Sequence, residues 1–62
     1  MTRQEAERLG VGDRIRLDSL TATIVEAGPD YVAIQWDERP LPELYTRGGL
    51  MRFSLYNGRG QQ

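Results

Sequence analysis

The sequence predicts a mainly β domain, a five-stranded barrel preceded by a short N-terminal helix. Its 62 residues suffice for one small hydrophobic core. Between residues 11 and 56, apolar side chains alternate with polar ones, as in half-buried strands, and turn-forming residues divide this stretch into five short segments. Because an open sheet of five short strands leaves two exposed edges, we expect the sheet to curl into a barrel.

The start of the chain has the signature of a short helix. Thr2 and Glu5 have the spacing of a capping box, in which each side chain binds the backbone N–H of the other residue. Residues 3–9 contain no glycine, proline or β-branched residue, and Gly10 follows as a stop signal. We therefore predict one or two helical turns here, with Leu9 docked on the core.

A strand and a hairpin are predicted next. In residues 11–17, "VGDRIRL", apolar positions alternate with charged ones, and residues 18–19 turn the chain. Residues 21–27, "TATIVEA", are rich in β-branched side chains, and residues 28–30, "GPD", are a strong turn signal. Since residues 31–36, "YVAIQW", alternate again, the two runs on either side of this turn predict a hairpin.

The rest of the chain predicts a loop and two more short strands. Residues 37–43, "DERPLPE", form the loop, because prolines cannot donate to a sheet ladder. Residues 43–47, "ELYTR", form a fourth strand that ends at a Gly-Gly pair. We expect a 3₁₀ turn at residues 50–53, "LMRF", and a last strand at residues 54–56.

The domain organisation follows from these elements. Residues 1–10 form the helix and cap, residues 11–56 the barrel, and residues 57–62 a tail without an apolar anchor that we expect to fray. The predicted inward positions all lie on the apolar phase of their element. They are Leu9, Val11, Ile15, Leu17, Ala22, Ile24, Val32, Ile34, Trp36, Leu44, Leu50, Phe53 and Leu55.

Composition excludes several classes of function. The charged residues are eight arginines and nine carboxylates, and lysine, cysteine and histidine are absent. Without cysteine and histidine we predict no disulfide, no metal and no cofactor. Triad catalysis lacks its usual base, and the adjacent carboxylates Asp37 and Glu38 lie in a loop where solvated charge is the better interpretation. We therefore expect no catalytic residues and a protein that is not an enzyme.

The sequence also lacks membrane and export signals. No apolar run approaches the roughly 18 residues of a membrane span, and the N-terminus, "MTRQEAERLG", lacks the apolar centre of a signal peptide. We expect a cytoplasmic protein without a membrane partner. Its size and arginine-only basic set favour an accessory or regulatory protein of a bacterium or phage.

The order of these segments resembles the small SH3-like barrels of the KOW and Tudor type. The resemblance covers residues 10–56 through "VGDRIRL", "TATIVEAGPDYVAIQWD" and the closing "GGLMRF". It implies a five-stranded barrel that serves as a binding module. A KOW motif proper would have a glycine early in the second strand, where this chain has Leu20, Thr21 and Ala22, so a ribosomal function is not implied.

A second resemblance, in shape, is to the plasmid-borne type II dihydrofolate reductases, SH3-like barrels that assemble as tetramers around a pore. The segment "ELYTRGGLMRF" is similar to the one that carries their pore motif, and Leu44 and Tyr45 fall on its last two positions. Glu43 stands where that family has glutamine, and the family's pore lysine has no counterpart in this chain. An oligomeric reductase is therefore the third hypothesis for the function.

The preferred hypothesis is a non-catalytic module that binds a protein, with a second copy of the chain as one candidate partner. Trp36 and Phe53 fall on the inward phase, whereas Tyr31 and Tyr45 fall outward. Exposed tyrosine together with arginine is typical of recognition surfaces. The predicted contact surface consists of Tyr31, Gln35, Arg39, Leu41, Tyr45 and Arg47.

The alternative is a nucleic-acid-binding barrel that uses the arginines near the C-terminus. Arg47, Arg52 and Arg59 lie in residues 46–62, which contain no acidic residue. Three arginines can neutralise about three phosphates, which gives weak, salt-sensitive binding. The Arg-Gly-Gly and Gly-Arg-Gly steps occur once each, whereas disordered RNA-binding segments repeat them.

Overall fold

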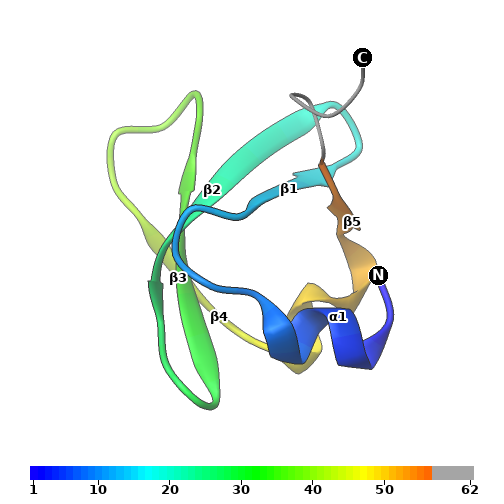
Figure 1. Ribbon diagram of the computed structural model, residues 1–62. Helices are drawn as coiled ribbons and strands as arrows, with labels where there is room; N and C mark the ends of the chain where they lie inside the picture. The colour runs from blue at the N-terminus through cyan, green and yellow to red at the C-terminus, as the bar shows by residue number, and fades with distance from the viewer. Residues whose placement is uncertain (57–62) are drawn as a thin grey trace.

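The computed structural model describes residues 1–56 and confirms a mainly β domain with a short N-terminal helix. Its five strands form one antiparallel sheet in the order β4-β3-β2-β1-β5 (Figure 1). The elements are α1 (Arg3–Arg8), β1 (Arg14–Leu17), β2 (Leu20–Ala27), β3 (Tyr31–Trp36), β4 (Glu43–Thr46), the 3₁₀ helix η1 (Gly48–Arg52) and β5 (Ser54–Leu55). The predicted tail, residues 57–62, lies outside the described residues.

Helix α1 begins at the predicted capping box. The Thr2 hydroxyl accepts a hydrogen bond from the Glu5 backbone N–H at 3.1 Å, and the Glu5 carboxylate accepts one from the Thr2 backbone N–H at 2.9 Å. These two bonds satisfy N–H groups that the first turn of a helix leaves without intrahelical partners. Ala6 and Leu9 are buried against the rest of the protein, so this short helix is held by packing as well as by its cap.

The predicted hairpin is the central pair of the sheet. Strand β2 pairs with β3 from Ala22 opposite Trp36 to Ala27 opposite Val32, and the Gly28 N–H donates to the Tyr31 carbonyl oxygen at 2.8 Å across the turn. A bulge between Ile24 and Glu26 shifts the register and leaves the intervening valine exposed.

The sheet curls but does not close into the predicted barrel. Within residues 1–56, β4 pairs with β3 alone and β5 with β1 alone, so the two end strands are not hydrogen-bonded to each other. The physical reason is local: η1 occupies the chain between them, and β5 is only two residues long. Side chains cover part of the gap instead, because the Phe53 ring packs on Trp36 and Tyr45 with centroid distances of 5.8 and 5.6 Å.

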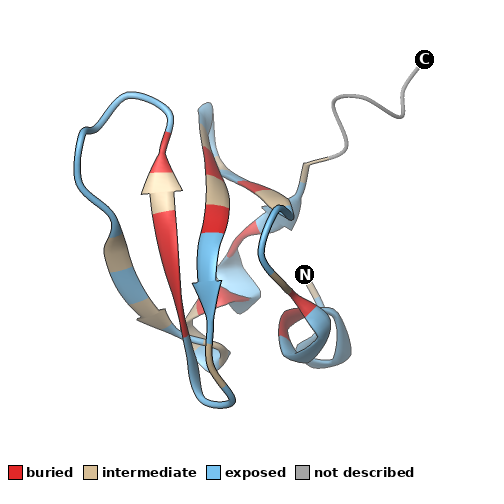
Figure 2. Cartoon of the chain, turned by 60° about the vertical axis from the view of Figure 1, so that its left-hand side comes forward, coloured by how far each residue is buried: buried red, intermediate tan, exposed pale blue. Residues whose placement is uncertain are grey.

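The core lies between the curled sheet, α1 and η1 (Figure 2). Most predicted inward positions are buried, and Leu17 is partly buried against them. The buried core cluster consists of Leu9, Ile15, Ala22, Ile24, Val32, Ile34, Trp36, Leu50 and Phe53.

Three predicted core residues are exposed. Val11, at 68% exposure, lies in a turn before β1 rather than in a strand. Leu44, also at 68%, pairs with Ala33 on the outer face, so its neighbour Tyr45 takes the inner position, the reverse of the prediction. Leu55, at 48%, pairs with the buried Ile15 but lies in an edge strand that no further strand within residues 1–56 covers.

Candidate binding site

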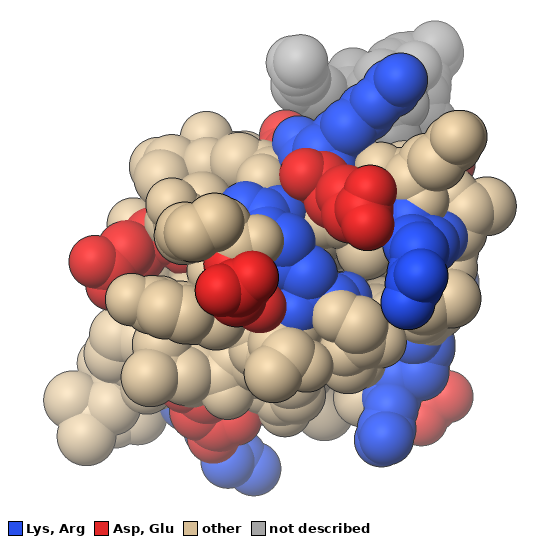
Figure 3. Space-filling model, turned by 90° about the horizontal axis from the view of Figure 1, so that it is seen from below, with Lys and Arg blue, Asp and Glu red and all other residues tan. Residues whose placement is uncertain are grey.

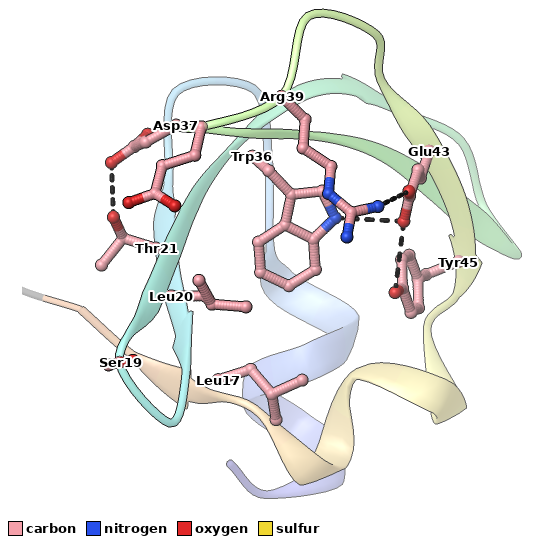
Figure 4. Close-up of a pocket in the computed structure, with 10 residues that line it drawn as sticks. Leu17, Ser19, Leu20, Thr21, Trp36, Asp37, Arg39, Glu43 and Tyr45 are labelled. Carbon is pink, nitrogen blue, oxygen red and sulfur yellow. Dashed lines mark hydrogen bonds and ion pairs between the residues drawn. The ribbon is translucent and has the colours of Figure 1, made fainter.

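A hollow of about 360 Å³ opens on the inner side of the curled sheet (Figure 4). Leu17 and Leu20 approach it from the β1–β2 hairpin, Trp36 lies at its centre, and Glu43 and Tyr45 approach from β4. The full lining is Leu17, Ser19, Leu20, Thr21, Trp36, Asp37, Glu38, Arg39, Glu43 and Tyr45. The β1–β2 turn and the β3–β4 loop lie at the same end of the antiparallel sheet, which explains why residues far apart in sequence meet here.

Glu43 fixes the indole of Trp36 at the centre of the hollow. The Trp36 Nε1–H donates to Glu43 Oε1 at 3.0 Å, and the Tyr45 hydroxyl lies 3.5 Å from the same oxygen. The Arg39 guanidinium lies 3.2 Å from Glu43 Oε2, but its side chain is 64% exposed. The indole is thus held by a partly buried bond, whereas within residues 1–56 the outer carboxylate oxygen has one partner, the solvent-exposed Arg39, which a ligand could replace.

On the opposite side the lining includes Asp37, and an ion pair beside the hollow joins this residue, which follows β3, to Arg14 of β1. Arg14 donates two hydrogen bonds to the Asp37 carboxylate, each at 2.9 Å, and a third to the Thr23 hydroxyl at 2.9 Å. The Thr21 hydroxyl also donates to Asp37. The hydrogen bonds from Arg14 and then from Thr21 lower the pKa of Asp37, and the bond to Asp37 raises the pKa of Arg14. The end of β3 is therefore tied to β1 across β2.

The hollow carries a negative charge. Its lining contains three carboxylates, Asp37, Glu38 and Glu43, against one guanidinium, Arg39, so its formal charge is 1 − 3 = −2. Arg14, which lies on Asp37, reduces this to −1. Elsewhere, arginines and carboxylates are interspersed on the face seen in Figure 3, without a single basic patch. The hollow thus favours cationic and apolar groups over phosphates.

Four of the six predicted contact residues line the hollow or lie in or beside the β3–β4 loop. Arg39 and Tyr45 line the hollow, the Gln35 amide donates to the Arg39 carbonyl oxygen, and Leu41 is exposed in the loop between the strands. Tyr31 is exposed at the opposite end of β3. The predicted surface is therefore not one continuous cluster.

The structure gives Arg47 a structural role. Its guanidinium donates to the Gly28 carbonyl oxygen at 2.9 and 2.7 Å, and to the carbonyl oxygens of Ala6 and Leu9 at 2.9 and 3.1 Å. Arg47 thus caps the C-terminal end of α1 and joins it to the β2–β3 turn. Its predicted contact with a partner stays untested.

The other two arginines of the alternative hypothesis are placed differently. Arg52 is exposed in the last turn of η1. Arg59 lies outside the described residues. The structure therefore does not bring the three arginines together into one described surface.

The polar half of the hollow is not predicted from the sequence. The apolar phase puts Trp36 in the core, the proline loop favours solvated charge at Asp37 and Glu38, and Glu43 stands out only as a departure from the reductase pore motif. The bond between Trp36 and Glu43 spans the proline loop, and that between Arg14 and Asp37 spans 23 positions. The available signal was the alternation of Glu43 with Tyr45, which puts both on one face.

The described residues show neither a metal site nor a membrane span. Residues 1–56 contain no group of three or more histidine, cysteine, aspartate or glutamate side chains that could hold a metal ion. No helix in this part of the chain is long and apolar enough to cross a membrane. Comparisons of the chain with protein-family models, curated proteins and solved structures gave no match.

Proposed function

We propose that the protein is a non-catalytic module that binds a segment of another protein in the hollow beside Trp36. The observation that carries this proposal is a hollow with apolar lining, in which Glu43 already holds the indole N–H of Trp36 and Asp37 already holds the guanidinium of Arg14. The volume of the hollow, 360 Å³, falls within the range of about 300–1,000 Å³ that is typical of ligand pockets. The order of four strands, a 3₁₀ helix and a fifth strand beside the first supports an open relative of the SH3-like barrels.

A protein partner fits this lining better than a nucleic acid does. Tryptophan, tyrosine and arginine are the side chains most enriched at the centres of protein interfaces, and Trp36, Tyr45 and Arg39 meet here. The net negative charge of the hollow opposes phosphate groups. Arg47 has its guanidinium bound to backbone carbonyl oxygens, so the nucleic-acid alternative rests on Arg52 and Arg59.

A peptide-display selection against the immobilised protein tests the proposal. We expect enriched peptides whose binding is lost in Leu20→Ser, because Leu20 lines the hollow at 42% exposure. Leu55→Ser is the matched control, since Leu55 has a similar exposure of 48% and lies outside the hollow. Peptides that bind both variants equally, or no enriched peptide at all, would contradict the proposal.

Binding of DNA and RNA to the same protein tests the nucleic-acid alternative. We expect single- and double-stranded DNA and RNA to bind more weakly than the selected peptides at moderate salt. Tight binding that weakens steeply with salt and is lost when Arg52 and Arg59 are changed to alanine would favour that alternative instead.

A further inference from the structure

We propose that the partner segment binds as an added β-strand along the open edge of β4 and places a basic side chain in the hollow. This inference rests on the proposed function and names the mode of binding and the chemistry of the partner. Two features of β4 carry it: the direction of its backbone groups and the charge beside its inner face.

The backbone groups of β4 alternate in direction. The Arg47 N–H donates to the Asp30 carbonyl oxygen at 3.1 Å, and this pair continues the register of β4 on β3. Hydrogen-bonded pairs alternate along an antiparallel ladder, so Tyr45 and Glu43 also bond to β3. The N–H and C=O groups of the alternate residues, Leu44 between Glu43 and Tyr45 and Thr46 between Tyr45 and Arg47, therefore point to the open side.

These outward groups offer a site for one short strand. Within residues 1–56, β4 has a neighbouring strand on one side only. Leu44 and Thr46 together present two donors and two acceptors, which is what an added strand uses in strand-addition recognition. Pro42 immediately precedes β4 and offers no N–H, so the open edge is short.

The side chains of the added strand would alternate between two different environments. A residue opposite Leu44 would lie on the outer face, beside an exposed leucine whose own partner on β3 is Ala33. Its two neighbours would lie on the inner face, beside Glu43 and Tyr45, which line the hollow. An apolar residue suits the position opposite Leu44, and the side chains of its two neighbours enter the hollow.

Charge selects a basic residue for the inner position. The outer oxygen of Glu43 has the exposed Arg39 as its charged partner at 3.2 Å. The hollow keeps a formal charge of −2 with Arg39 counted, and of −1 when Arg14 on Asp37 is counted as well. An incoming lysine or arginine could bind Glu43 without removing the bond from Trp36 to the other carboxylate oxygen. A glutamate there would instead meet like charge, which disfavours binding.

Synthetic peptides test the proposal with the whole chain. The probes are acetylated, amidated heptapeptides Thr-Thr-Val-Xaa-Val-Thr-Thr, which place valine opposite Leu44 when Xaa lies on the inner face, and in which Xaa is lysine, arginine, glutamine or glutamate. We expect the lysine and arginine peptides to bind at least about tenfold more tightly than the glutamate peptide, as one charge-assisted bond allows. Glu43→Gln, which keeps an oxygen for the indole, should reduce this difference to about twofold.

A proline at position 44 tests the strand pairing itself. Leu44→Pro removes an N–H that points to the open side and leaves the hydrogen bonds to β3 intact, as edge strands tolerate. We expect peptide binding to fall about tenfold, by the loss of roughly one hydrogen bond. Leu44→Thr is the matched control, because it shortens the same side chain but keeps the N–H. Thermal unfolding and amide spectra verify that both variants fold.

The outcomes separate this inference from the proposed function. If display-selected peptides bind Leu44→Pro and the unchanged protein equally but fail to bind Leu20→Ser, the hollow binds peptides and the strand pairing is wrong. If peptide affinity is independent of the charge at Xaa, the basic preference is wrong. If the Leu44 and Thr46 amides become protected from hydrogen exchange with rising protein concentration and no peptide, a second copy occupies the edge and the proposal is overturned.

Discussion

Removing the Arg47 guanidinium should destabilise the fold more than any other change of a surface arginine. Arg47→Ala leaves the carbonyl oxygens of Gly28, Ala6 and Leu9 without a charged donor. Hydrogen bonds to charged groups contribute about 1.5–3 kcal/mol each, but water can reach part of this half-exposed site. We therefore expect a net loss of about 2–3 kcal/mol, roughly the contribution of one fully formed bond.

Such a loss is large for a chain of this size. Small single cores rarely supply more than about 3–5 kcal/mol, and in small domains 1 kcal/mol shifts the melting temperature by about 4–8 °C. Urea and thermal unfolding followed by circular dichroism should show a melting temperature about 10–20 °C lower for Arg47→Ala. Arg52→Ala is the matched control and should change stability by less than about 0.5 kcal/mol.

Equal stabilities of the two variants would show that the contacts of Arg47 do not hold α1 to the β2–β3 turn in solution. Arg47→Lys gives a further check, because one ammonium cannot reproduce the planar fork that reaches both segments. We expect this variant to lie between Arg47→Ala and the unchanged protein.

Two further predictions concern the ion pair and the core. The pKa of Asp37 is lowered from its ordinary value of 3.8, mainly by Arg14, so its ionised form stabilises the fold above that value, and this contribution is lost as the pH falls through the lowered pKa. Unfolding measured as a function of pH should therefore show that Asp37→Asn loses less stability below about pH 4 than the unchanged protein does. The same pH profile for both proteins would contradict the pairing. Ile34→Ala should lower the free energy of unfolding by about 2–5 kcal/mol because Ile34 is fully buried, whereas Leu44→Ala should lower it by less than about 0.5 kcal/mol. Urea unfolding that ranks the two variants in the opposite order would contradict the register of β4.

The strands and turns were predictable from local pattern because each has its own signal. The Gly-Pro-Asp turn and the alternating runs on either side of it define the β2–β3 hairpin, and the capping box defines α1. The phase of β4 was not predictable in this way. Leucine and tyrosine stand side by side at positions 44 and 45, so alternation alone allows either one to face inward, and pairing with β3 decides the matter.

Closure of the sheet and the polar contacts were beyond local pattern for a different reason. Whether β4 meets β5 depends on where η1 takes the chain, which is a property of the packed protein. The role of Arg47 depends on contacts with Leu9 at the end of α1, 38 positions earlier in the sequence, and with Gly28 in the β2–β3 turn, 19 positions earlier. Such contacts follow from tertiary packing and leave no periodic signal in the sequence.

Amide hydrogen exchange along β4 in the peptide-free protein shows whether the strand edge beside the hollow is open. The register predicts slow exchange for Glu43 and Tyr45, whose N–H groups bond to β3, and fast exchange for Leu44 and Thr46, whose N–H groups face outward. Measured by NMR in dilute solution, this alternation is the predicted result. Slow exchange of Leu44 and Thr46 under the same conditions would show that the edge is already occupied and would contradict the account.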